Sequence, residues 1–234
     1  MDLDLSRFYY SSEKPIHEVT YEIMRDIIVC GYVFEGEQII ESHYAKTLNV
    51  SRTPIRVAIE KLETQGLVYE VKGKTYAKGL GVSGINNIYD LQISLERLVL
   101  NNVLNNISQK DVIDFYQIFD QINEAAENGN LIIASELNEM IHQKIFQISA
   151  YPGIVDIIKI AYDYVRGFNL LAFKDLSRQS KITFEHRLMV ENICNKDYHN
   201  TYLSLKEHID CCKKYSIEKY NQNIERRKEE LELI

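Results

Sequence analysis

The most constraining feature of this chain is the segment LNVSRTPIRVAIEKLETQGLVYEVKGKTYAKG at residues 48–79. Asn49 can adopt the left-handed conformation of a tight turn. Ser51 suits a helix N-cap, where its hydroxyl accepts a hydrogen bond from a first-turn amide. Pro54 then falls in the first turn, where its missing N–H costs little, and Gly66 ends the helical pattern. The segment therefore predicts a turn, a helix and a following strand pair.

The residues on either side extend this unit. Upstream, residues 14–30 predict a helix with apolar residues at steps of three and four, namely Ile16, Val19, Ile23 and Ile27. Residues 41–48 predict a second, short helix, and the buried face of the third comprises Ile55, Ile59 and Leu62. LVYEV and TYAKG flank Lys72-Gly73-Lys74, which is typical of a β-hairpin with a basic tip. Three helices followed by a hairpin make a winged helix-turn-helix.

Of three consecutive parts of the chain, only this same region carries a net positive charge. The whole chain has a formal net charge of −7, which argues against indiscriminate nucleic-acid binding. Residues 1–41 carry 3 basic and 9 acidic side chains, and residues 79–234 carry 17 basic and 22 acidic ones. Residues 42–78 carry 7 basic and 3 acidic side chains, a net charge of +4. One basic segment in an acidic chain indicates a localised anionic partner.

The third predicted helix carries the residues expected to contact DNA. Arg52 and Arg56 are four residues apart and so project from one side near the helix start, where a helix in the major groove reaches base edges. The remaining contacts are expected from Ser51 and Thr53 to phosphates, and from Lys72 and Lys74 to the backbone or minor groove. Any one of these residues alone would be better explained as part of a solvated face. Their combination with the N-cap, proline, hairpin and charge distribution favours double-stranded DNA binding.

The stretch GEQIIESHYAKTLNVSRTPIRVAIEKLETQGLVYEVKGK resembles the DNA-binding domain of the GntR family of bacterial transcription regulators. The resemblance covers about residues 12–80 and is most specific in VSRTPIR and KLETQGLV. It implies that Arg52 and Arg56 are the main DNA-contacting positions, assisted by Ser51 and Thr53. Two departures stand out: Val57 replaces a frequent glutamate, and the hairpin tip lacks a second glycine.

The rest of the chain predicts helices alone. Residues 84–106 place Ile88, Leu91, Leu95 and Leu98 at helical steps, and Ser108 caps a helix that ends near Gly129. Further helices are expected at 130–149, 153–173, 178–194 and 197–223. Six helices with short connections predict an antiparallel bundle. We therefore expect a mainly α chain, with a winged helix-turn-helix domain at 1–80 and an all-helical domain at 81–234.

This second part resembles the FCD ligand domain of the FadR group within the GntR family, over about residues 84–222. That family shows an aspartate or asparagine four residues before a histidine, then a Glu-His pair, then a histidine about one helix further on. The matching stretches here are NEMIH, FEHRL and KEHID. The resemblance implies a divalent metal, such as zinc or nickel, bound by Asn138, His142, His186 and His208.

Residue chemistry supports part of that implication. Asn138 and His142 share a helix face, and imidazole suits zinc, nickel and similar ions. Any single histidine is more often a satisfied core or surface residue, as we expect for His17, His43 and His199. Asn138 supplies only a neutral oxygen where the family often has aspartate, so the ion would keep its double positive charge. The hypothesis is weaker metal binding and stronger attraction of an anionic metabolite such as a carboxylate.

Two further positions bear on this site. Gln92 stands where the family usually has an arginine that pairs with a ligand carboxylate, so we expect an effector of different shape or charge. Cys211 and Cys212 lie about one turn beyond His208. They could serve a soft metal, although a buried thiol is the commoner case.

The leading hypothesis is a homodimeric, effector-controlled transcription regulator, more often a repressor than an activator, that binds a pseudo-palindromic operator. One alternative is a direct metal sensor that uses the same residues. Another is a metalloenzyme, but Glu185 is poorly aimed for a general base beside His186, so we expect no enzymatic activity. The start MDLDLSRFYY does not resemble a signal peptide, and no run reaches the roughly 18 apolar residues of a membrane span, so a cytoplasmic location is expected.

Overall fold

The computed structural model describes residues 14–151 and 153–232. The segment MDLDLSRFYY, which was predicted not to be a signal peptide, lies outside the described residues. The chain forms two compact units. Unit 1 contains the residues up to Ile85, with Arg166–Phe168 and the residues from Ser216 onward. Unit 2 contains Asn86–Val165 and Asn169–Tyr215. The domain boundary expected at residue 80 stays a prediction.

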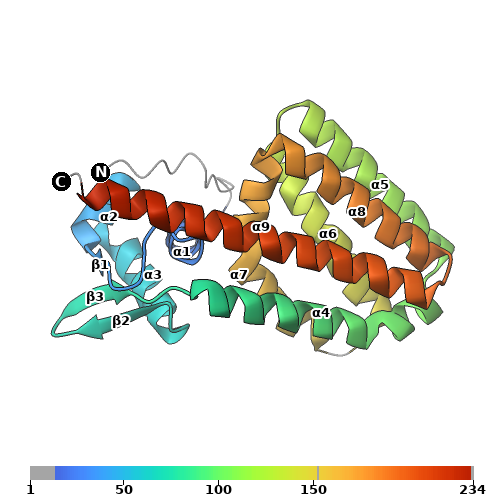
Figure 1. Ribbon diagram of the computed structural model, residues 1–234, viewed down its shortest axis with the longest axis horizontal. Coiled ribbons are helices and arrows are strands. Elements are labelled where there is room, and N and C mark those ends of the chain that lie inside the picture. Colours follow the sequence, from blue (N-terminus) through green and yellow to red (C-terminus); the bar gives the residue numbers. More distant parts are fainter. Residues whose placement is uncertain (1–13, 152, 233–234) are drawn as a thin grey trace. The chain divides into compact units, whose positions relative to one another are not determined.

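Unit 1 contains the predicted winged helix-turn-helix (Figure 1). Its elements in chain order are α1 (Ile16–Val29), β1 (Gln38–Ile39), α2 (Glu41–Thr47), α3 (Arg52–Thr64), β2 (Val68–Val71) and β3 (Lys74–Ala77). Asn49 has a φ of 52°, which is the left-handed turn expected between α2 and α3. The buried side of α3 consists of Ile55, Ala58 and Leu62, each 0% exposed, whereas Ile59 is only half-buried. These residues pack α3 against α1 and α2.

The sheet of unit 1 has the order β1-β3-β2, with both pairings antiparallel. Val71 faces Lys74, so Lys72 and Gly73 alone form the connection between β2 and β3. Both have positive φ, at 50° and 72°. Glycine adopts this conformation without strain, and such two-residue turns match the twist of a hairpin. Strand β1, which pairs with β3, was not predicted.

The last part of the long helix α9 (Tyr198–Glu232) belongs to unit 1 and packs on the winged domain. Asn223 donates to the backbone oxygen of Cys30 at 2.8 Å, and Arg227 pairs with Glu37. A Cβ at Gly31 would come within 2.9 Å of the Tyr220 ring, so only glycine allows this approach. These contacts explain why the helix continues past the predicted end at residue 223.

Unit 2 is built mainly from six helices of the described chain, as predicted (Figure 1). Besides α9 these are α4 (Gly81–Asn106), α5 (Gln109–Glu127), α6 (Leu131–Ser149), α7 (Ile154–Lys174) and α8 (Leu176–Cys194). Ser108 and Asp111 form a reciprocal capping box at the start of α5. Helices α5, α6 and α8 pack on one another around apolar side chains that include Ala125, Ala134 and Ile182.

The fold class is therefore mainly α with one small sheet, as the sequence predicts. Among the residues that the structure describes, no helix combines the length and hydropathy that a membrane crossing requires.

Candidate DNA-binding face and metal centre

The start of α3 presents its polar side chains to solvent. Ser51, Arg52, Thr53 and Arg56 are all exposed, on the side opposite the buried Ile55. Ser51 occupies the N-cap position with extended backbone, but its side chain forms no capping hydrogen bond. The predicted N-cap position is thus confirmed, whereas the predicted capping hydrogen bond is wrong. The same hydroxyl can instead bond an anion at the helix start.

Arg56 is held by α2. Its Nε lies 2.9 Å from the Glu41 carboxylate, and the side chains of Arg56 and Glu41 are 61% and 36% exposed. Pairs this exposed contribute little to stability. The contact does fix the direction of the guanidinium on the exposed face of α3, and binding to a base edge would have to share or break it.

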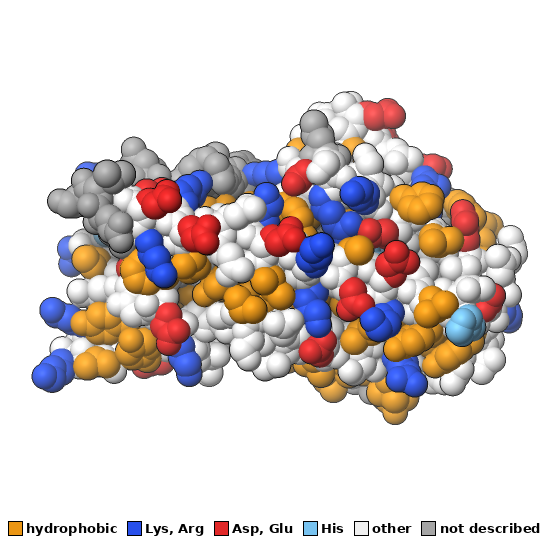
Figure 2. All heavy atoms as spheres, viewed as in Figure 1, with side chains coloured by type: hydrophobic (Ala, Val, Ile, Leu, Met, Phe, Trp, Pro, Cys, Tyr) orange, Lys and Arg blue, Asp and Glu red, His pale blue; other side chains and the backbone are white. Residues whose placement is uncertain are grey.

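The hairpin of β2 and β3 carries Lys72 and Lys74 at its exposed tip. Behind the tip, the rings of Tyr69 and Tyr76 stack with centroids 5.7 Å apart, which stiffens the pair of strands. Figure 2 shows Lys and Arg side chains along the edge that holds this sheet in Figure 1. The basic tip and the start of α3 thus belong to the same small domain.

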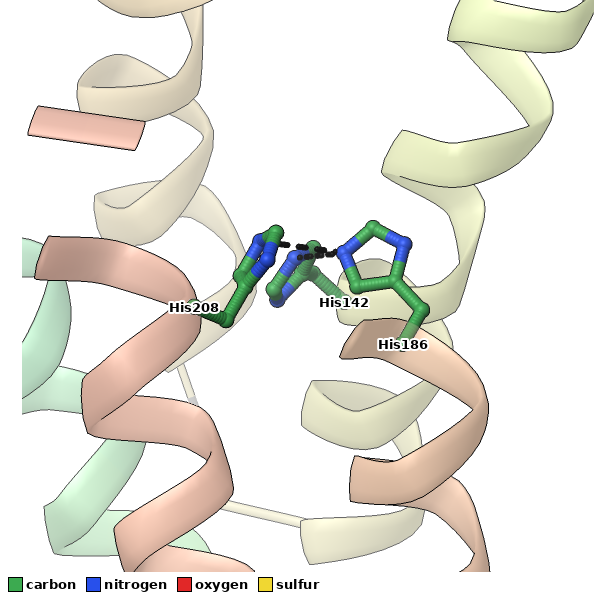
Figure 3. Close-up of side chains that lie close together, drawn as sticks. All are labelled: His142, His186 and His208. Atoms are coloured by element: carbon green, nitrogen blue, oxygen red, sulfur yellow. Dashed lines mark hydrogen bonds between the residues drawn. The ribbon is translucent and has the colours of Figure 1, made fainter. Parts of the chain in front are cut away.

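The second candidate site is a group of three buried histidines in unit 2. His142 comes from α6, His186 from α8 and His208 from α9, and their rings point toward one another (Figure 3). Nε2 of His186 lies 3.0 Å from Nε2 of His142 and 3.0 Å from Nε2 of His208. The three residues are 3–4% exposed. In the described part of the chain they form the one group of His, Cys, Asp or Glu side chains able to surround a metal ion.

Each histidine is oriented by an oxygen on its outer nitrogen. Nδ1 of His142 faces Glu96 at 3.2 Å, and Nδ1 of His208 faces Glu185 at 2.8 Å. Nδ1 of His186 lies 2.6 Å from the amide oxygen of Asn138. Since these oxygens accept hydrogen bonds, the protons belong on Nδ1. All three inner Nε2 atoms are then left with lone pairs that face one another.

Burial and charge favour an ionised Glu96 and a neutral His186, but they favour a protonated His208. Burial opposes ionisation of Glu96, but His142, Tyr162 and Gln92 outweigh it and lower the pKa of Glu96. Burial, followed by charge on the neighbouring histidines, holds the pKa of His186 well below its ordinary value. Burial also lowers the pKa of His208, but Cys212 and Glu185 outweigh it and raise that pKa to about 10. A proton on Nε2 of His208 would form a hydrogen bond to Nε2 of His186, but it would leave the contact between His186 and His142 without a proton.

A single cation would satisfy all three nitrogens at once. Zinc–nitrogen bonds are about 2.0–2.1 Å long, so two nitrogens on one tetrahedral ion lie roughly 3.3 Å apart. The two separations of 3.0 Å from His186 are close to that value. An oxygen acceptor on the outer nitrogen is also the usual support for a metal-bound imidazole. The residues present therefore fit a divalent metal.

Asn138 does not lie where the sequence led us to expect it. It was predicted as a metal ligand, but its oxygen contacts the outer nitrogen of His186 and its amide nitrogen donates to the backbone oxygen of Ala134 at 3.0 Å. Both ends of the amide are thereby engaged away from the three inner nitrogens. The structure places Asn138 as the residue that orients His186.

The residues that sequence reasoning missed are those that support the histidines. Glu96 lies on α4 and is 1% exposed, and Tyr162 on α7 donates to it at 2.9 Å. Arg178 grips Glu185 with two hydrogen bonds of 2.7 and 3.0 Å. Glu185 therefore points at His208 and not at the metal position. The sequence offered one signal for Glu96. It lies four residues after Gln92, so the two share a helix face, and Gln92 was predicted to contact the effector.

Gln92 lies at the wall of a small cavity next to the histidines. The cavity leaves about 30 Å³ for the centres of water-sized molecules, which is room for one or two waters or an ion. Nε2 of Gln92 donates to Glu96 and to Tyr162, both at 3.1 Å. Cys212 also lines the cavity, and its sulfur lies 3.7 Å from Nε2 of His208. Cys211 borders a separate, shallow surface depression.

The predicted surface histidines differ in exposure. His17 and His199 are exposed, and the half-buried His43 packs edge-on against the Tyr44 ring.

Comparison with known proteins identifies the second unit. The FCD domain model matches residues 87–210. The HTH-type transcriptional regulator YdhC of Bacillus subtilis is 25% identical over 194 residues, which cover 81% of this chain and 86% of that protein. The HTH-type transcriptional repressor RspR of Escherichia coli is 22% identical over 197 residues, covering 84% and 86%.

A solved structure shares the fold of both units. Escherichia coli McbR/YncC superposes with a TM-score of 0.63 at 15% identity, over 88% of this chain and 99% of that one. The FCD match spans more than half of the chain, and the alignments with the two relatives extend well beyond the length of that match. The chain therefore belongs to the GntR family of transcriptional regulators, in the group that carries an FCD domain.

Proposed function

We propose that this regulator binds a pseudo-palindromic operator as a homodimer, and that its operator affinity changes when a small carboxylate binds at the metal centre. The observation that carries the proposal is the group of three inner-facing histidine nitrogens in the FCD domain, in the same chain as an exposed basic helix start. We further infer repression, because relatives such as RspR and the gluconate operon repressor of Bacillus subtilis are named repressors.

The DNA-binding role is assigned to the exposed face of α3 and the hairpin tip. Arg52 and Arg56 would contact base edges in the major groove, with Ser51 and Thr53 on phosphates. Lys72 and Lys74 would contact the sugar-phosphate backbone or the minor groove beside them. A regulator with this task works in the cytoplasm, where the chromosome is.

Replacing Lys74 by alanine tests the role of the hairpin. If Lys74 neutralises one phosphate, the variant binds all duplexes more weakly, and the slope of log K against log salt becomes smaller by about 1. The measurement is fluorescence anisotropy of labelled duplexes at several salt concentrations. Lys110→Ala, an exposed lysine of unit 2, is the control that leaves the slope unchanged. An unchanged slope for Lys74→Ala would remove the hairpin from the interface.

His142, His186 and His208 would hold the divalent ion. With three neutral imidazoles the bound ion keeps its double positive charge and can polarise and attract an anion. Effector binding changes operator affinity only if the effector prefers one conformation of the dimer by a differential free energy.

Replacing Asn138 by alanine tests its support of His186. Loss of an oxygen that orients a metal-bound histidine typically weakens metal binding by about 10–100-fold. Competition against a chromophoric chelator measures this affinity, and Asn101→Ala, an exposed asparagine on α4, is the matched control. Asn138→Asp keeps the acceptor and should bind metal at least as well as the natural protein. Unchanged affinity in Asn138→Ala would mean that the amide plays no part at the site.

The proposal is tested by measuring operator affinity for metal-free protein, metal-loaded protein, and metal-loaded protein with a panel of organic acids. We expect the third state to differ from the second by at least about fivefold for one acid or more, a typical coupling. A panel without effect on the metal-loaded protein would contradict carboxylate control.

The same experiment decides a second candidate, a direct metal sensor. The size of the cavity favours this candidate, since about 30 Å³ admits an ion more readily than an organic acid. A metal sensor changes operator affinity between the metal-free and metal-loaded states, with no further change on adding any acid.

A further inference from the structure

The wall of the cavity contains one buried acceptor that the protein does not use. Gln92 is 4% exposed, and its amide nitrogen donates to Glu96 and to Tyr162. Its amide oxygen is buried too, but has no hydrogen-bond partner among the described residues. Leaving a buried acceptor unpaired costs free energy, so native proteins generally provide it with a donor.

The neighbours of Gln92 determine which end of its amide is unpaired. Tyr162 gives its hydroxyl proton to Glu96 at 2.9 Å, so its oxygen can only accept from Gln92. Oε1 of Glu96 accepts from both the Tyr162 hydroxyl and the Gln92 amide nitrogen, so it too faces donors. Turning the amide round would set its oxygen against both acceptors. The oxygen of Gln92 must therefore be the end turned away from Glu96 and Tyr162.

Tyr89, Ser135 and Asn169 also line the cavity and carry donor groups, but none of them bonds the Gln92 oxygen. The described residues that line the cavity include no lysine or arginine, but they include the acidic residue Glu139. This end of the cavity thus favours a donor, either a hydroxyl or an ammonium group. The histidine end favours a metal and the anion that a metal attracts. Glu96 contacts both Gln92 and His142, so the two ends are separated by little more than one carboxylate.

We propose that the amide oxygen of Gln92 accepts a hydrogen bond from the effector, which is therefore a small carboxylate that also carries a hydroxyl or amino group. This inference rests on the proposed carboxylate site. An arginine in place of Gln92 would favour a second carboxylate at this end. Gln92 instead disfavours a second carboxylate, because two acceptors would meet.

The test uses four probes with the same three-carbon frame: 3-hydroxypropionate, β-alanine, propionate and malonate. Calorimetry with metal-loaded protein is expected to show that 3-hydroxypropionate or β-alanine binds about tenfold or more tightly than propionate, as for one buried hydrogen bond, and that malonate binds no better than propionate. Gln92→Met removes the acceptor and should abolish the preference. Gln117→Met, the same change at an exposed position of α5, should keep it.

A second variant guards against loss of folding. Gln92→Arg keeps donors toward Glu96 and Tyr162 but has no acceptor, so it should lose the preference for 3-hydroxypropionate and gain one for malonate. If the natural protein binds propionate and 3-hydroxypropionate equally, or if the preference survives in both Gln92 variants, the role of Gln92 is overturned while the carboxylate site stands. If no probe binds metal-loaded protein, the carboxylate site falls and this inference falls with it.

Discussion

Replacing Arg52 by alanine is expected to weaken binding to the specific operator by roughly 5- to 150-fold, which corresponds to about 1–3 kcal/mol for one arginine–guanine contact. Arg52 begins α3, is exposed to solvent, and is the arginine of this face closest to the helix N-terminus. Arginine at this place can bond a guanine with two parallel hydrogen bonds, which alanine cannot replace. The loss should fall on specific DNA more than on scrambled DNA.

Fluorescence anisotropy with a specific and a scrambled duplex, at one fixed salt concentration, measures this effect. Arg97→Ala is the matched control, because Arg97 is exposed on α4 in unit 2. Equal losses on both duplexes would make Arg52 a phosphate contact and not a base contact. No loss on either would take α3 out of the interface.

Replacing His186 by glutamine is expected to lower metal affinity by at least about 100-fold, more than the 10–100-fold loss from a supporting residue. His186 is the most damaging of the three to lose, because its Nε2 is the atom that approaches both of the others at 3.0 Å. Without it, His142 and His208 remain as two ligands on separate helices. The folded protein then gains little from added metal.

Thermal unfolding provides an independent measurement. A metal at about 100 times its Kd stabilises the folded state by about 2.7 kcal/mol, so natural protein should melt at a higher temperature when metal is added and His186→Gln should not. His199→Gln, at an exposed position of α9, is the matched control. A His186→Gln protein with full metal-dependent stabilisation would show that the ion binds elsewhere.

The helices could be predicted from the sequence because the signals that define them lie within a few residues of one another. Apolar steps of three and four residues, the Ser108 cap and the left-handed Asn49 fix the helices and the turn. The long-range contacts could not be obtained in this way. Helix α9 continues past residue 223 because Asn223 and Arg227 bond residues 193 and 190 positions earlier in the chain.

The candidate metal site shows the same division. The spacing of the histidines along the chain indicated that they could meet, but not which oxygen would face each outer nitrogen. Glu96 reaches His142 across 46 residues, and Asn138 reaches His186 across 48. Helix packing decides those pairings. The i, i+4 spacing of Asn138 and His142 indicated a shared helix face and suggested that both bind the metal. In the packed bundle, Asn138 instead contacts His186 on the neighbouring helix α8.

We expect this chain to recognise a specific DNA sequence through its winged domain. Repeated selection from a random duplex library by the purified, full-length protein tests it, and the operator need not be identified beforehand. The selection is run in metal-free, metal-loaded and acid-supplemented buffers. We expect enrichment of one inverted repeat whose affinity falls in Arg52→Ala. Failure to enrich any sequence in all of these buffers, with folded protein, would contradict the claim.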